Sequence, residues 1–161
     1  MKNFSLLVCT ILLFFACQQE PKVNFKPLDL LSEGGIPVTI MAPDSAQVKK
    51  SDFGPVMKDI TVRKGEDYFV QIYASEASSS DVSRLKAQEL SEVKSKKYFS
   101  KIIREEPDGF IFETKVDSNY IDYGFRYVQI RGSNEYIFQT GLIGPFTLEA
   151  VENMYEAVQQ K

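Results

Sequence analysis

The chain of 161 residues contains no histidine and no tryptophan, and it has only two cysteines. The lack of histidine excludes catalytic triads that use an imidazole base, and it excludes an imidazole acid–base group near neutral pH. Zinc sites built from imidazole or thiolate ligands are excluded as well. The chemistries that remain are carboxylate catalysis, a serine–lysine pair and calcium bound by oxygen ligands.

An excess of positive charge is also missing. The formal net charge is −3, and removal of residues 1–16, which contain Lys2, would bring it to about −4. A nucleic-acid partner requires a basic stripe on the protein surface. We therefore expect no nucleic-acid partner.

The one long apolar run is Phe4–Ala16, which follows Lys2. As a helix at about 1.5 Å per residue it would be roughly 20 Å long, whereas the hydrocarbon core of a bilayer is about 30 Å thick. The run is therefore too short for a permanent span. It predicts an export signal, residues 1–16, that is cleaved from the mature protein.

The end of this run, Ala16 followed by Cys17, resembles the lipobox of bacterial lipoprotein signal peptides. The resemblance implies that a lipid is attached to the thiol of Cys17, that the chain is cut before it, and that the new amine is acylated. The stretch departs from the usual pattern at Phe14 and Phe15. An ordinary secretory signal with an incidental cysteine is the alternative. Acylation is favoured because Cys9 leaves with the signal, so Cys17 has no disulfide partner in an oxidising compartment.

The residue after the cysteine is Gln18, whereas an Asp there marks inner-membrane retention in lipoproteins. The resemblance therefore implies an outer-membrane location, with the membrane as one partner through the acyl chains and an envelope protein as another. Residues 17–35 contain Pro21, Pro27 and the Gly34–Gly35 pair, and they show no periodicity. We expect a flexible tether there, with a root-mean-square reach of about 23 Å, and a single domain over residues 36–161.

Within the domain, alternating apolar residues predict strands, and a 3.6-residue period predicts two helices. The predicted strands are Ile36–Ala42, Met57–Arg63, Tyr68–Ser75, Tyr98–Glu105, Phe110–Val116, Tyr123–Arg131 and Glu135–Gly141, and the helices are Asp81–Lys96 and one capped by Thr147. Ser45–Pro55 is expected to be irregular, and Ser79 or Ser80 is the expected cap of the first helix. Short connections between strands favour antiparallel pairing. The predicted fold class is α+β, with a single antiparallel sheet of six or seven strands flanked by two helices.

This order of elements, three strands, a helix, four strands and a helix, resembles that of the PsbP-like fold. The resemblance implies a fold and does not imply a function.

The predicted strand Tyr123–Arg131 has an aromatic face formed by Tyr123, Phe125 and Tyr127. Such a face can form the floor of a ligand groove, or it can form the core beneath the last helix. The core interpretation is favoured because large aromatic side chains supply most of the buried area of a small domain.

The apolar loop before the last helix consists of Gly141, Leu142, Ile143, Gly144, Pro145 and Phe146. It can pack beneath the helix as a lid on the core, or it can present an apolar tip to a partner. We favour the lid, because short loops often pack their own apolar residues.

No residue is predicted to be catalytic, and no metal or cofactor is expected. The acidic stretch Asp117–Asp122 fails the calcium-loop pattern because Ile121 stands where an oxygen ligand is needed. Ser80 and the lysines of a possible serine–lysine pair are all expected on the surface. The sequence favours a lipid-anchored, non-catalytic accessory or protein-interaction domain of the cell envelope. The alternative is a domain that binds a small hydrophobic ligand or a lipid.

Overall fold

The computed structural model of the chain describes residues 24–54, 56–142 and 144–159. The signal segment 1–16 and Cys17 lie outside the described residues. Along the chain the elements are β1 Phe25–Asp29, α1 Leu30–Glu33, β2 Thr39–Pro43, β3 Gln47–Phe53, β4 Met57–Lys64, β5 Tyr68–Glu76, α2 Val82–Ser95, β6 Phe99–Glu106, β7 Gly109–Lys115, β8 Ile121–Arg131, β9 Asn134–Thr140 and α3 Leu148–Val158.

The main sheet has seven antiparallel strands in the order β3-β4-β5-β9-β8-β7-β6. Two meanders, β3-β4-β5 and β6 to β9, are joined by the pairing of β5 with β9, in which Ile72 lies opposite Phe138. The predicted α+β class and the large antiparallel sheet are confirmed. The prediction of a single sheet flanked by two helices was wrong, because within the described residues β1 and β2 form a second sheet and α1 is a third helix. Both predicted helices are present as α2 and α3, and Thr147 caps α3 by accepting a hydrogen bond from the backbone N–H of Ala150 at 3.2 Å.

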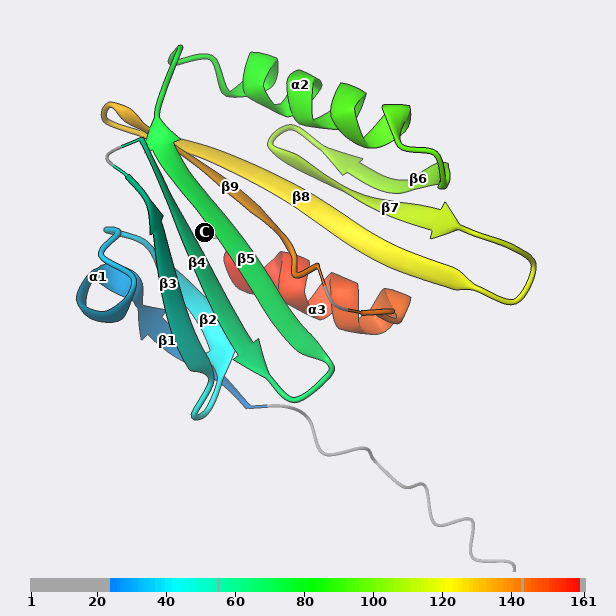
Figure 1. Cartoon of the computed structure of the whole chain (residues 1–161), viewed down its shortest axis with the longest axis horizontal. Coiled ribbons are helices and arrows are strands. Elements are labelled where there is room, and N and C mark those ends of the chain that lie inside the picture. Colours follow the sequence, from blue (N-terminus) through cyan, green and yellow to red (C-terminus); the bar gives the residue numbers. More distant parts are fainter. Residues whose placement is uncertain (1–23, 55, 143, 160–161) are drawn as a thin grey trace, which may run out of the picture.

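Side chains on the two faces of the sheet pack against different elements. On β7, Ile111 belongs to the large core shared with α3, whereas its neighbours Phe110 and Phe112 pack with Val93 of α2. This alternation follows from the two-residue period of a strand. Helix α3 and the β1–β2 pair therefore cover one face of the main sheet, and α2 covers part of the other (Figure 1).

The structure differs from the expected tether between Phe25 and Gly35. Strand β1 pairs with β2 in a separate two-stranded sheet, and the side chain of Leu30 in α1 is fully buried in the large core. Asp29 caps α1 by accepting a hydrogen bond from Leu31 N at 3.0 Å. The glycines that suggested a tether end this helix, and Gly35 has a φ of +68° that suits a glycine.

Two further expectations were wrong. Ser45–Pro55 was predicted to be irregular, but Gln47–Phe53 forms β3 at the edge of the main sheet. This strand has few apolar side chains because one face of it is open to solvent, and its backbone pairing with β4 holds it in place. The cap of α2 is Asp81, whose side chain accepts from Arg84 N at 3.0 Å, and not Ser79 or Ser80.

The neighbouring leucines of α1 test whether residues 25–33 belong to the domain. Leu30 is fully buried and Leu31 is 57% exposed. We expect Leu30→Ala to lower the free energy of unfolding by about 3 kcal/mol through the cavity it leaves, and Leu31→Ala by less than about 0.5 kcal/mol. Urea denaturation of both variants measures this difference. Equal, small effects would show that α1 does not pack on the core.

Candidate functional site

The face of the main sheet on the α2 side carries a row of polar side chains across five strands. Lys49 lies opposite Thr61, Thr61 opposite Gln71, Gln71 opposite Gln139, and Gln139 opposite Arg126. We call these five residues the polar row. A sheet face that is covered along its whole width would carry apolar residues at these positions. Helix α2 covers only the Arg126 end of the polar row, where it packs on β8 and β6.

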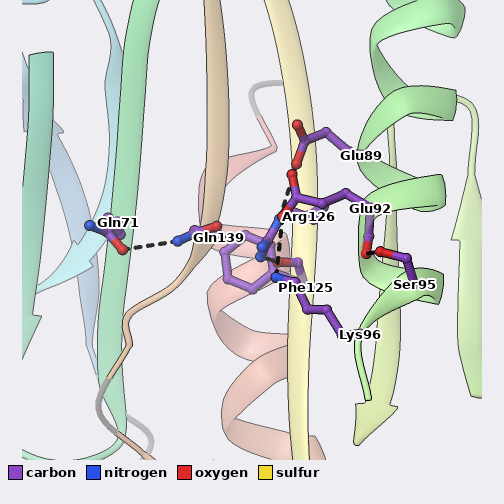
Figure 2. A network of polar contacts seen from close by, with 8 residues as sticks. All are labelled: Gln71, Glu89, Glu92, Ser95, Lys96, Phe125, Arg126 and Gln139. Carbon is purple, nitrogen blue, oxygen red and sulfur yellow. Dashed lines mark hydrogen bonds and ion pairs between the residues drawn. The ribbon is translucent and has the colours of Figure 1, made fainter. Parts of the chain in front are cut away.

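The buried members of the row satisfy one another with hydrogen bonds. Gln139 Nε2 donates to Gln71 Oε1 at 2.9 Å, and Gln71 Nε2 donates to both carboxylate oxygens of Asp59 at 2.9 and 3.0 Å. Figure 2 shows the bond between the two glutamines and the neighbouring contacts of Arg126. Because each amide has a partner, this part of the row is a structural network.

At its covered end the row is fixed to α2 by an ion pair. Arg126 Nε lies 3.2 Å from Glu89 Oε2, and both side chains are nearly buried (Figure 2). Burial raises the pKa of Glu89, although the guanidinium opposes this shift, and burial lowers the pKa of Arg126. The opposite directions share one cause, which is the loss of water around each charged group.

At its open end the row borders a groove of about 610 Å³. The groove is lined by Ser45, Gln47, Lys49, Thr61, Arg63, Lys64, Gly65 and Phe69. We call these residues the cationic groove, because three of them are cations and none is an acid. The acidic residues Glu66 and Asp67 follow in the adjoining β4–β5 turn, and they do not line the groove.

Arg63 is held in place within the groove. Its Nε donates to the carbonyl oxygen of Gly65 at 3.0 Å, and its guanidinium carbon lies 5.3 Å from the centre of the Phe69 ring. The hydrogen bond uses Nε, so the two terminal nitrogens keep their donors for a ligand. A guanidinium in such a position binds carboxylate or phosphate groups with two parallel hydrogen bonds.

The ring of Phe69 lies over Gly141, where an added Cβ would come within 2.3 Å of it. Glycine at position 141 therefore makes room for the ring that supports Arg63. This contact links the first residue of the apolar loop to the groove.

The other predicted sites lie elsewhere. Phe125 and Tyr127 are core residues, because Tyr155 of α3 packs on both rings at centre distances of 5.8 and 6.3 Å, and Tyr123 is partly buried beside them. The aromatic face is thus occupied by α3 and is not an open ligand platform.

The apolar loop is packed on the core at one end and exposed to solvent at the other. Phe146 is buried in the large core, and its backbone N–H donates to Asp122 Oδ1 at 2.7 Å, so this end of the loop is a lid. Leu142 is 81% exposed, and Gly144 and Pro145 are exposed as well. Ile143 lies outside the described residues.

Over the residues that the structure describes, no group of three or more acidic, histidine or cysteine side chains is placed to hold a metal ion. Within the same residues, none of the helices has the length and apolar character that crossing a bilayer requires. Asp117, in the acidic stretch, accepts hydrogen bonds from Asn119 N and Tyr120 N, so it stabilises its own turn.

Comparisons of the chain with protein-family models, with curated proteins and with solved structures return no match. The likeness of residues 1–17 to lipoprotein signals and the likeness of the element order to the PsbP-like fold stay predictions.

Sequence reasoning missed the cationic groove because its residues come from two turns and three strands, of which β3 was expected to be irregular. A signal was present in the sequence. The polar residues Gln47, Lys49 and Ser51 recur with a two-residue period, and the apolar Val48 lies between the first two. Such alternation indicates a strand with one solvent-facing side.

The ion pair between Glu89 and Arg126 can be tested by a double-mutant cycle. We expect Glu89→Leu or Arg126→Met alone to lower the free energy of unfolding by about 3 kcal/mol, because each leaves a buried charge unpaired. The double variant should lose less than the sum of the two. Glu92→Leu, which removes an exposed pair with Lys96, is the control and should cost about 0.5 kcal/mol. Additive losses in urea denaturation would contradict the pairing.

Proposed function

We propose that the protein is a lipid-anchored lipoprotein of the cell envelope, attached through Cys17, whose α+β domain is a non-catalytic interaction module. The signal-like residues 1–16 and Cys17, the one cysteine in the sequence after them, support the anchor, and the absence of histidine from the sequence supports a non-catalytic role. By resemblance to lipoprotein sorting, the outer membrane is the proposed location.

The observation that carries the interaction role is the open part of the main sheet. The cationic groove, at the open end of the polar row, presents Lys49, Arg63 and Lys64 on a protein whose net charge is negative. A cationic groove on an acidic protein favours an acidic partner segment, because complementary charges guide the encounter and fix the register of the complex. Arg63 would bind a partner carboxylate, and Gln47 and Thr61 would supply further hydrogen bonds.

The alternative role, binding of a small hydrophobic ligand at the aromatic face, has no such support. Its floor would be formed by Phe125 and Tyr127, and these side chains pack against Tyr155. The interaction role is therefore the stronger proposal.

The anchor is tested by cysteine replacement in cells. We expect the wild-type protein and the Cys9→Ser variant to fractionate with membranes and to carry acyl groups in their mass, because Cys9 leaves with the signal. The Cys17→Ser variant should lack the acyl mass, because the atom that accepts the lipid is gone. Membrane fractionation and intact-mass spectrometry give the readouts. A wild-type mass without acyl groups would refute the anchor.

The groove is tested by photo-crosslinking in cells. A photoreactive amino acid at Gln47 should give a discrete crosslinked product, whereas the same amino acid at Asn153, which is exposed on α3, should give none. Adding Arg63→Glu should reduce the Gln47 product several-fold, because it reverses the charge at the groove. Arg84→Glu, on the exposed side of α2, is the matched charge control. Equal products from Gln47 and Asn153 would contradict the proposed surface.

A further inference from the structure

One end of the main sheet gathers exposed apolar side chains. Among the described residues, eight large hydrophobic side chains are exposed, and five of them are Tyr98, Val116, Tyr120, Ile121 and Leu142. We call these five the apolar rim. The other three, Leu31, Phe53 and Val56, lie on α1 and at the β3–β4 turn.

The pairing of the strands places the rim at a single end of the sheet. Strands β4, β9 and β7 end there, and β3, β5, β8 and β6 begin there, because neighbours in the sheet are antiparallel. Lys115 N donates to Tyr98 O at 2.8 Å, and Val116 N donates to Tyr120 O at 3.1 Å, so four members share the β6–β7–β8 corner. Leu142 follows the end of β9 at the same sheet end.

The chain enters the domain at this end too. Phe25, the first residue of β1, packs edge-to-face on Tyr68 at the start of β5, with ring centres 5.6 Å apart. Lys26 pairs with Asp44 in the β2–β3 turn at 2.9 Å. Figure 1 shows the start of β1 beside the β2–β3 and β4–β5 turns, and the β7–β8 hairpin lies apart from them at the right of the view.

Chain length then restricts how far this end can lie from an anchor at Cys17. Only residues 18–24 separate Cys17 from Phe25. The eight steps along the chain from Cys17 to Phe25 span at most about 29 Å even when fully extended. A lipid on Cys17 would therefore hold the sheet end that carries the rim close to the membrane surface.

The side chains of the rim suit the boundary between headgroups and acyl chains. Tyrosine places an apolar ring in the acyl region and its hydroxyl among the headgroups, which explains its enrichment at membrane interfaces. Cations adjoin the rim: Lys97 Nζ lies 5.0 Å from the centre of the Tyr98 ring, and Lys115 ends β7. Lysines beside apolar groups contact anionic headgroups while their stems lie on apolar surface.

We propose that the apolar rim is a membrane-docking surface, which lies against the bilayer that holds the lipid of Cys17. This inference rests on the proposed anchor and adds an orientation to it: the rim faces the lipid, and the opposite end of the sheet, with Phe53 and Val56, faces away. The apolar side chains supply the main attraction, because Asp117 in the β7–β8 hairpin, and Glu66 and Asp67 at the β4–β5 turn, offset part of the lysine charge.

The absence of tryptophan provides a direct test, because one introduced indole is the sole indole fluorophore of the chain. The acylated full-length protein is reconstituted into phosphatidylethanolamine–phosphatidylglycerol vesicles, with and without brominated acyl chains. We expect the emission of the Leu142→Trp variant to shift to the blue and to be quenched by the brominated lipid. The Val56→Trp variant, at the far end of the sheet, should show neither change. Solvent-like emission from Leu142→Trp, or equal quenching of both variants, would overturn the proposal.

A second measurement separates the docking surface from the anchor. The mature Cys17→Ser chain, which carries no lipid, should partition weakly onto the same vesicles. In the same Cys17→Ser chain, the triple variant Val116→Ser, Ile121→Ser and Leu142→Ser should have a partition coefficient at least about tenfold lower. The reason is that less apolar surface would be buried in the bilayer. The matched triple Leu31→Ser, Phe53→Ser and Val56→Ser should change partitioning by less than about twofold.

The outcomes of the two proposals remain distinguishable. Acyl groups missing from the wild-type mass would refute the anchor, whatever the vesicles show. If the wild-type mass carries acyl groups but the rim triple partitions like the matched triple in the Cys17→Ser chain, the docking surface is refuted and the anchor stands.

Discussion

The packing of α3 on the central strands is the contact on which the rest of the structure depends. Tyr155 lies edge-to-face against both Phe125 and Tyr127, and Met154 is fully buried beside it. The fit requires Gly109 on β7, where an added Cβ would lie 2.6 Å from the hydroxyl of Tyr155 and from the carbonyl oxygen of Arg126. The rings of Phe125 and Tyr127 are therefore covered by Tyr155 and are not open to a ligand.

Because α3 and the β1–β2 pair cover one face of the main sheet, the open part of the sheet lies on the face that α2 covers only in part. The β1–β2 pair and α3 share the large core, whereas α2 is held by a smaller cluster around Val93 and by the Glu89–Arg126 ion pair. Between the α2 cluster and the open strands, this face of the sheet has buried polar side chains such as Gln71 and Gln139 in place of an apolar surface. The accessible chemistry is therefore concentrated in the cationic groove and in the apolar rim.

Much of this fold could be predicted from hydrophobic periodicity. The six strands from β4 to β9, as well as α2 and α3, coincide with predicted segments to within a few residues, because their apolar residues follow the period of a strand or of a helix. Strand β1, edge strand β3 and the short α1 escaped prediction. In β3 backbone pairing replaces apolar burial, and α1 is too short to show a period, so the glycines that end it suggested a tether.

The candidate site was less predictable for a physical reason. Arg63, Phe69 and Gly141 come from three strands or their ends, and the stacking of Arg63 on a ring that needs a glycine beneath it is a tertiary contact. The rim was visible in part, since the loop from Gly141 to Phe146 stood out as apolar. Which of its residues turn outward is a tertiary property: the backbone N–H of Phe146 donates to Asp122 and its side chain is buried, whereas Leu142 is exposed.

With the proposed lipid on Cys17, only residues 18–24 would separate the anchor from the domain, and the domain should therefore lie on the membrane. Neutron reflectometry of the acylated protein on a supported bilayer measures this arrangement directly, because it resolves the layers of lipid, water and protein along the membrane normal. The account predicts a protein layer in contact with the headgroups. A water layer between the headgroups and the domain would contradict it.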